Sequence, residues 1–136
     1  MKLLICIDDR GGMAFNKRRV SRDKNVVADI SEYIGDATLF VDSYSAELFL
    51  EAGLNMIVSE NALKFSEADD FVFVEREEPS AYMKEASEIV IYKWNRLYPF
   101  DVAMKKAPAD FGFKLESVFE FQGNAHDKIT REVYKK

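Results

Sequence analysis

The apolar run that opens the chain, Leu3 to Ile7, constrains the fold more than any other feature. It is uninterrupted, and Asp8, Asp9 and a pair of glycines follow it closely. A strand with one face in water alternates apolar and polar residues, whereas an uninterrupted run is typical of a strand buried on both faces. Strands of this kind occur in α/β sheets that helices cover on both sides. The run therefore predicts an α/β protein.

Strand-like and helix-like segments alternate through the first two thirds of the chain. Apolar segments predict strands at 37–41, 55–59 and 70–75. The predicted helices are one from an N-cap at Ser21 to about Ile34, ended by Gly35, one capped by Ser43 or Ser45 and ended by Gly53, and one opened by Pro79 and running to Ala86. Because alternating strands and helices are joined by right-handed crossovers, the sheet is predicted to be mainly parallel.

The pattern changes in the last third of the chain. Residues 88–94 predict another buried strand, whereas 113–121 and 129–134 alternate apolar and polar residues, which is typical of a half-exposed antiparallel hairpin. The sequence thus predicts one three-layer α/β domain over residues 1–136, with helices on both faces of a mainly parallel sheet and a C-terminal antiparallel hairpin. The edge at 113–121 also predicts a homodimer in which this strand pairs across a two-fold axis.

Charge and composition exclude several classes of protein. The 19 Lys and Arg residues against 24 Asp and Glu give a net charge of −5, so the broad basic field of an extended nucleic-acid binder is absent. One cysteine and one histidine form none of the usual zinc sets, so no metal site is predicted. The first apolar run is too short for a signal sequence or a membrane span, which predicts a cytoplasmic protein with no membrane partner.

The two residues that often carry chemistry have ordinary predicted places. Cys6 lies inside the first strand and is expected to be a small core residue. His126 falls in a hairpin turn and is predicted to be a surface residue, since a general base should lie in a cleft. A single histidine also argues against triads chosen among several histidines, and against a ribonuclease Z-type activity, which needs a His-rich two-metal motif.

A basic loop after the first strand is the strongest local contrast in this acidic chain. From Arg10 to Lys24 there are six basic residues and one acid. Open α/β sheets bind ligands at the carboxyl ends of their strands, and guanidinium groups and helix-terminal amides favour phosphate or carboxylate. The predicted anion site comprises Arg18, Arg19, Ser21 and Arg22, with Asp8 or Asp9 orienting a base, a ribose or a metal-bound water. The alternative is a solvated loop whose arginines pair with the surplus acids.

Short motifs spread over nearly the whole chain resemble dihydrofolate reductase. The motifs are Leu3 to Asp8 with Gly12-Met13, Glu88 to Trp94 followed by Leu97 to Asp101, and the hairpin segments 113–121 and 129–136. They resemble, in that order, the family's first strand and mobile substrate loop, the strand leading to its Phe-Pro loop, and its closing hairpin. The resemblance implies the family's fold. It also implies that Ser45, in the turn into a helix that receives cofactor phosphate, and Ser59, on the next strand, face the cofactor NADPH.

Three departures from that family bear on activity. Arg18 to Ser21 stand where the family has Leu-Pro-Trp after the mobile loop. The carboxylate that binds the pterin ring would correspond to Asp23 or Asp29. No glycine occurs between Phe71 and Ile91, although close approach of backbone amides to the cofactor phosphate requires a glycine turn there.

Two hypotheses of function remain. The first is a binding or accessory protein that holds a small anionic or nucleotide-like ligand at the basic loop, with no cofactor. The second is an enzyme, either a divergent NADPH-dependent reductase or a phosphate-transforming activity centred on Asp8, Arg18, Arg19 and Arg22.

Overall fold

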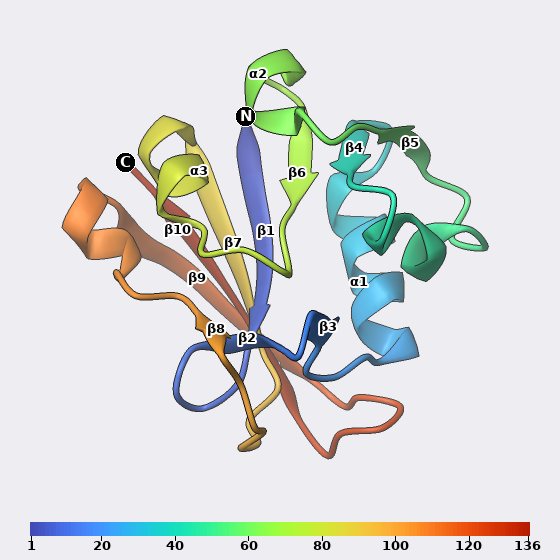
Figure 1. Cartoon of the computed structure of the whole chain (residues 1–136), viewed down its shortest axis with the longest axis vertical. Coiled ribbons are helices and arrows are strands. Elements are labelled where there is room, and N and C mark those ends of the chain that lie inside the picture. Colours follow the sequence, from blue (N-terminus) through green and yellow to red (C-terminus); the bar gives the residue numbers. More distant parts are fainter.

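A seven-stranded sheet forms the centre of the computed structural model, which describes all 136 residues (Figure 1). Its strand order is β5-β4-β6-β1-β7-β10-β9. The strands are β1 (Lys2–Ile7), β4 (Thr38–Val41), β5 (Asn55–Val58), β6 (Phe71–Phe73), β7 (Glu88–Lys93), β9 (Lys114–Phe121) and β10 (Ile129–Lys135). All pairs from β5 to β7 are parallel, and β10 is antiparallel to both β7 and β9. The predicted mainly parallel sheet with a closing hairpin is confirmed.

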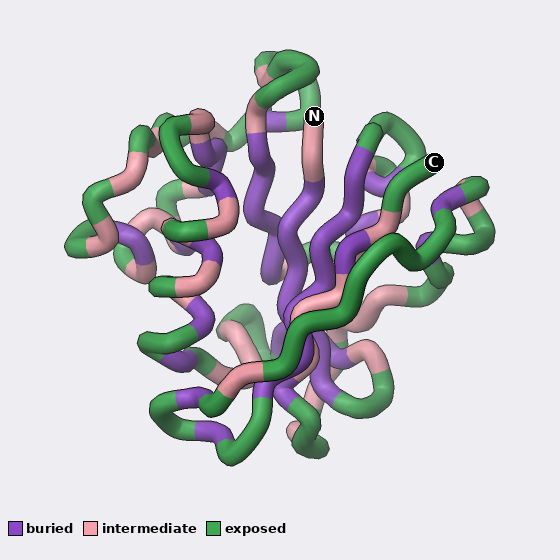
Figure 2. Tube along the Cα trace, turned by 180° about the vertical axis from the view of Figure 1, so that it is seen from behind, coloured by how far each residue is buried: buried purple, intermediate pink, exposed green.

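Helices cover both faces of this sheet, because successive residues of the buried strands point to opposite sides. Leu4 and Cys6 of β1 belong to one core with α1 (Lys24–Ile34) and the 3-10 helix η1 (Ser45–Phe49). Leu3 and Ile5 belong to the other core, with α2 (Ala62–Phe65), α3 (Ser80–Glu85) and the 3-10 helix η2 (Pro108–Phe111) packed against it. In Figure 2 the central strands are the continuous buried part of the chain. The three-layer α/β architecture is therefore confirmed.

A second, three-stranded sheet lies beside the first and was not predicted. It consists of β2 (Gly12–Phe15), β3 (Arg18–Arg19) and β8 (Val102–Ala103), in the order β3-β2-β8. Asn16 and Lys17 join β2 to β3 with φ angles of 53° and 65°, the left-handed conformation that a two-residue hairpin turn requires. The basic loop is thus a hairpin, and the prediction of an irregular loop was wrong.

Helix α1 begins two residues later than predicted. Its N-cap is Asp23, whose carboxylate accepts a hydrogen bond from the Asn25 N–H, so the prediction of Ser21 as N-cap was wrong. The Ser21 hydroxyl is bonded to other side chains instead. The predicted end at Gly35 is confirmed. The next helix is the short η1, which has no side-chain cap, so the caps predicted at Ser43 and Ser45 were also wrong.

Strand β9 forms an open edge of the large sheet. Seven of its eight residues are exposed, and the pairing register with β10 shifts between Val133 and Tyr134, which marks a β-bulge. A bulge weakens an edge as a template for pairing. The homodimer through this strand stays a prediction. Separately, none of the helices has the length and apolar character needed to cross a membrane.

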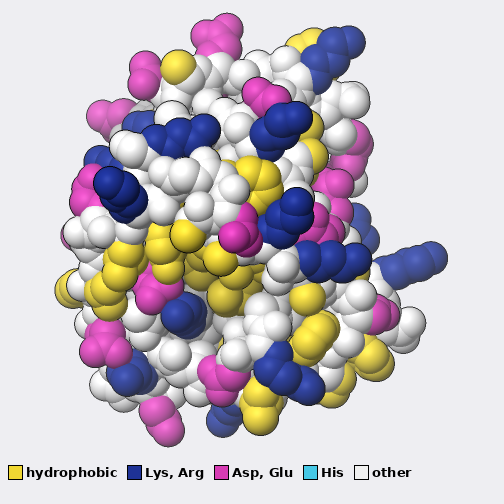
Figure 3. Space-filling model, turned by 90° about the vertical axis from the view of Figure 1, so that its left-hand side faces the viewer, with side chains coloured by type: hydrophobic (Ala, Val, Ile, Leu, Met, Phe, Trp, Pro, Cys, Tyr) yellow, Lys and Arg dark blue, Asp and Glu magenta, His cyan; other side chains and the backbone are white.

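Figure 3 shows the side of the molecule that carries η2 and β8, where Lys and Arg side chains stand around a band of hydrophobic side chains. Tyr82, Met104 and Phe111 are half-buried against the core on that face of the sheet. A depression of about 380 Å³ lies near β8, at the carboxyl end of β1, and its lining includes Asp9, Arg10, Lys105 and Lys106. This depression is basic but lies apart from Arg18 to Arg22.

Candidate functional site

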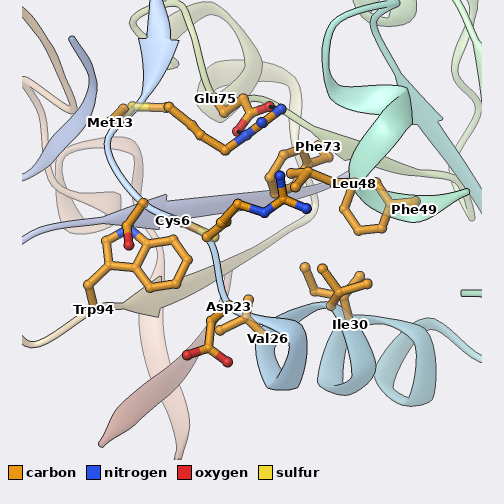
Figure 4. Close-up of a pocket in the computed structure, with 14 residues that line it drawn as sticks. Cys6, Met13, Asp23, Val26, Ile30, Leu48, Phe49, Phe73, Glu75 and Trp94 are labelled. Atoms are coloured by element: carbon orange, nitrogen blue, oxygen red, sulfur yellow. Dashed lines mark hydrogen bonds and ion pairs between the residues drawn. The ribbon is translucent and has the colours of Figure 1, made fainter. Parts of the chain in front are cut away.

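A narrow cleft lies between α1 and the carboxyl ends of β1 and β6 (Figure 4). Nine of its 14 lining residues are hydrophobic. Val26 and Ile30 of α1 form one wall, Trp94 and Asp23 lie at one end, and Phe49 lies at the other. The cavity volume is about 20 Å³, which is room for about one ordered water. We call it the α1 cleft.

A buried ion pair closes the side of the α1 cleft opposite α1. The guanidinium of Arg19 binds Glu75 with both Nε and Nη2, at 2.9 Å and 3.0 Å, and Ser45 Oγ donates to the same carboxylate at 2.6 Å. The Glu75 side chain is 5 % exposed and that of Arg19 is 11 % exposed. Burial lowers the pKa of Arg19, but the hydrogen bond and the charge of Glu75 raise it by more, so the pKa lies above the usual value for arginine. Arg19 is therefore fully engaged within the protein, and Ser45 contacts Glu75 inside the fold.

The Cys6 thiol lies beside this ion pair. Burial, and then the charge of Glu75, raise its pKa far above the usual value for a thiol. A thiol that stays protonated is a poor nucleophile. Its predicted role as a core residue fits this environment.

The one histidine lies behind the end of the α1 cleft that Asp23 and Trp94 form, outside the cleft lining and in a buried hydrogen-bonded chain. His126 Nδ1 is 2.8 Å from Asp23 Oδ2, and Nε2 is 2.8 Å from the Tyr98 hydroxyl and 3.0 Å from Ser21 Oγ. The ring stacks on Trp94, with centroids 4.8 Å apart. The prediction of a surface histidine was wrong, because the turn that carries it folds back onto the N-terminus of α1.

Asp23 holds that turn in place. Its two oxygens accept backbone N–H bonds from Asn25, Asn124 and Ala125, in addition to the contact with His126. Burial raises the pKa of Asp23, but these hydrogen bonds together lower it to about 2. A Cβ at Gly123 would lie 2.6 Å from Asp23 Oδ2, so only glycine allows the turn to approach this closely. Neither Asp23 nor Asp29 has a free carboxylate, since Asp29 binds Tyr92 and Arg131.

The structure brings together only part of the predicted anion site. Arg19, Ser21 and Arg22 line the α1 cleft, and Arg18 lies on β3 with its side chain exposed. Asp8 is buried and accepts three backbone N–H bonds, from Arg10, Gly12 and Tyr98, so its carboxylate organises loops. Asp9 is exposed beside the basic depression near β8. The Asp8 carboxylate is therefore not free to orient a ligand as predicted, and Asp9 does not line the α1 cleft with Arg19 and Arg22.

Arg22 lies where the α1 cleft meets a wide groove. The groove, about 770 Å³, runs between α1 and η1, and Arg22 and Leu48 line both spaces. Arg22 is exposed and forms no ion pair or side-chain hydrogen bond with the protein. Its guanidinium is thus free to bind an anion at the junction between groove and cleft, whereas the carboxylates of the groove disfavour an anion along its length; these are Asp23, Glu32, Glu47 and Glu51.

A second pocket, of about 270 Å³, lies at the carboxyl ends of β4 to β6 and includes Ser59. Its charged lining is four carboxylates, Asp42, Glu60, Glu75 and Glu77, and two bases, Lys17 and Arg76. After β6 the chain continues as Val74-Glu75-Arg76-Glu77, so side chains stand where a phosphate cradle needs bare backbone. The residues present do not fit the phosphates of a dinucleotide such as NADPH, because the surplus carboxylates repel them.

The architecture has a counterpart among solved structures, although the sequence matches no protein-family model and no curated protein. One match is a dihydrofolate reductase from Enterococcus faecalis, determined in complex with NADP(H) and RAB-propyl. The TM-score is 0.67 at 9% sequence identity, and the match covers 98% of this chain and 94% of that chain. Nearly every element of one chain therefore has a partner in the other, and the protein has the fold of dihydrofolate reductase.

Proposed function

We propose that the protein binds a small anionic ligand with a flat apolar body, a class that includes nucleotide-like rings. The observation that carries the proposal is an exposed, unpaired Arg22 at the mouth of an apolar cleft. The apolar body packs between Val26, Ile30 and Phe49, and the anionic group binds the guanidinium of Arg22. The cleft lies at the sheet edge where α/β proteins place their ligands.

A buried donor at the end of the cleft supports the same proposal. The indole nitrogen of Trp94 is buried and has no hydrogen-bond partner in the protein. Leaving such a donor unpaired costs about 1–3 kcal/mol, so a water or a ligand acceptor is expected to satisfy it. A ligand acceptor that reaches this nitrogen satisfies the donor and is oriented by it.

Entry into the cleft requires movement at its mouth, since the present volume holds about one water. Arg22 and Leu48 line both the cleft and the wide groove, and the Arg22 side chain is exposed while that of Leu48 is half-buried. A change of their rotamers joins the two spaces without moving the backbone. The ligand is thus expected to reach the cleft from the groove between α1 and η1.

NADPH-dependent reduction is the alternative that the fold supports. The acidic lining of the second pocket and the side chains after β6 argue against it in this chain. Titration with NADPH at low salt decides between NADPH-dependent reduction and binding of a small anion without a cofactor. A rise in Tm with NADPH, and oxidation of NADPH on addition of dihydrofolate, would support the reductase and contradict cofactor-free binding.

The direct test uses benzoate as a small aromatic anion and measures Tm. Benzoate is expected to raise the Tm of the natural protein, since a ligand at 100 times its Kd stabilises by about 2.7 kcal/mol. The Arg22→Ala variant should lose this response and Arg18→Ala should keep it, because Arg22 lines the cleft and Arg18 does not. Equal loss in both variants would place the anion on the basic hairpin, and no response in any protein would contradict the proposal.

A further inference from the structure

We propose that Ser21 is a nucleophile, activated by His126 and Asp23, and that the α1 cleft hydrolyses small carboxylic esters. The inference rests on the proposed function in one respect, that the α1 cleft admits a small molecule. It goes beyond binding because it assigns a reaction to three side chains that meet at the end of that cleft.

The three side chains have the geometry that acyl transfer requires. Ser21 Oγ is 3.0 Å from His126 Nε2, and His126 Nδ1 is 2.8 Å from Asp23 Oδ2. A serine, a base within hydrogen-bond reach and a carboxylate that orients the base form the same chain of contacts as in serine hydrolases on unrelated folds. One histidine is enough for this arrangement.

The orientation of the imidazole is set by its buried partner. The side chains of His126 and Asp23 are 2% and 0% exposed, and the second Asp23 oxygen already accepts backbone N–H bonds. A carboxylate can only accept, so the proton of the neutral ring lies on Nδ1 and the lone pair of Nε2 faces Ser21 and Tyr98. Stacking on Trp94 prevents the ring from turning away. His126 is therefore held as a base.

Trp94 supplies a donor for the second requirement, stabilisation of the oxyanion. Its indole nitrogen is buried without a partner, and the residue lines the α1 cleft together with Ser21. Figure 4 places Trp94 and Asp23 at the same end of the cleft. A fixed N–H in a site that excludes water stabilises charge as it develops on a carbonyl oxygen.

Tyr98 positions the serine. Its hydroxyl is 3.0 Å from Ser21 Oγ and 2.8 Å from His126 Nε2, so the three polar groups form one triangle. The Ser21 hydroxyl donates to the Tyr98 oxygen, and the Tyr98 hydroxyl in turn donates to His126 Nε2. The tyrosine thus directs the serine proton toward the base.

The reaction balances with water as the only co-reactant. Ser21 Oγ bonds to the ester carbonyl carbon, its proton passes to Nε2, and the carbonyl π electrons move onto oxygen, where the Trp94 N–H meets them. The C–O bond to the alcohol then breaks, and the alcohol leaves with the proton from Nε2. Water then attacks the acyl-serine and gives a proton to Nε2, the bond between the acyl carbon and Ser21 Oγ breaks to release the carboxylic acid, and Nε2 returns its proton to Ser21 Oγ. Because the present volume of the cleft holds about one water, an ester enters only after the mouth of the cleft opens toward the groove.

The test is covalent labelling with a small alkyl fluorophosphonate, followed by peptide mass spectrometry. One phosphonyl group is expected on Ser21, and none in Ser21→Ala. The labelling rate should fall at least about 100-fold in His126→Gln, the contribution of a general base, fall by less in Tyr98→Phe, which removes only a positioning group, and stay near the natural rate in Ser117→Ala. Ser117 is an exposed serine on β9 and serves as the matched control.

Two results would overturn the proposal. One is an unlabelled Ser21 in the folded natural protein, and the other is an equal labelling rate in His126→Gln that retains its near-ultraviolet circular dichroism. Should His126→Gln fail to fold, Tyr98→Phe decides, since complete loss of Ser21 labelling there, rather than a partial fall, would make Tyr98 rather than His126 the activating group. Benzoate separates this proposal from the previous one. If benzoate raises the Tm but Ser21 is not labelled, the nucleophile is contradicted and the binding site stands. If Ser21 is labelled but benzoate neither slows the labelling nor raises the Tm, only the benzoate site is contradicted.

Discussion

Asp23→Asn is the substitution whose effect the structure determines most closely. In the folded protein the pKa of Asp23 is lowered from 3.8 to about 2, because four hydrogen bonds to its carboxylate outweigh the effect of burial. At 1.36 kcal/mol per pKa unit, this shift contributes about 2 kcal/mol to the free energy of unfolding at neutral pH. Asparagine keeps the N-cap of α1 but turns one acceptor into a donor that faces the Ala125 N–H and His126. The expected total loss is about 2–4 kcal/mol.

The pH dependence separates the charge from the shape of Asp23. A carboxylate whose folded pKa is lowered stabilises the protein above its unfolded pKa, and this contribution is lost as the pH falls from about 4 to about 2. Asparagine has no such contribution. The gap in stability between the natural protein and Asp23→Asn should therefore narrow by about 2 kcal/mol between pH 7 and pH 2.

Urea unfolding followed by tryptophan fluorescence measures this gap. Trp94 is the only tryptophan and stacks on His126, so its emission reports directly on the turn that Asp23 holds. Asp36→Asn is the control, because Asp36 is exposed and its side chain makes no hydrogen bond. A gap of the same size at pH 7 and pH 2, or a loss below about 0.5 kcal/mol at pH 7, would refute the reasoning.

Three further predictions concern the parts that frame the site. Glu75→Gln leaves the Arg19 charge with only the exposed carboxylate of Glu47 as its partner and is expected to cost about 3 kcal/mol in urea unfolding, whereas Arg19→Met with Glu75→Leu should recover most of it. A loss from the double variant as large as from the single one would contradict this. Gly123→Ala should lower stability and weaken the stacking of His126 on Trp94, since the new Cβ would lie 2.6 Å from Asp23; unchanged Tm and fluorescence would show that the turn can move aside. Sedimentation equilibrium tests the homodimer: pairing through β9 predicts a dimer that Phe119→Lys converts to a monomer, and a monomeric natural protein would exclude it.

The large sheet was predictable because each of its strands is a separate apolar run. Every predicted strand exists, and the observed bounds differ from the predicted ones by a few residues at most. Helix α1 was predictable from Val26, Ile30 and Ile34, which face the sheet, and from Gly35. The small sheet was missed because β3 and β8 are two residues each and carry no periodicity. The one local signal was Asn16, which favours the left-handed conformation of a hairpin turn.

The site was harder to predict because its contacts join distant segments. His126 and Asp23 are 103 residues apart in sequence, and Arg19 and Glu75 are 56 apart. Composition counted the arginines of the basic loop as equivalent, yet Arg18 and Arg19 are neighbours on a strand and point to opposite sides. Only tertiary structure distinguishes Arg19, which is buried in an ion pair, from Arg22, which is free.

The absence of glycine after β6 links the missing cofactor cradle to the chemistry of the α1 cleft. The side chain of Glu75 occupies the position at the strand end and takes up the Arg19 guanidinium. With Arg19 engaged, the polar groups that remain available to a ligand are Arg22 at the mouth, and Ser21 and the Trp94 N–H at the end beside His126. The glutamate at this strand end therefore disfavours the binding of dinucleotide phosphate, and it also decides which polar residues are free to contact a ligand. A ligand or substrate of this protein is expected to be small enough to need no second binding pocket, unlike the paired substrate and cofactor of a reductase.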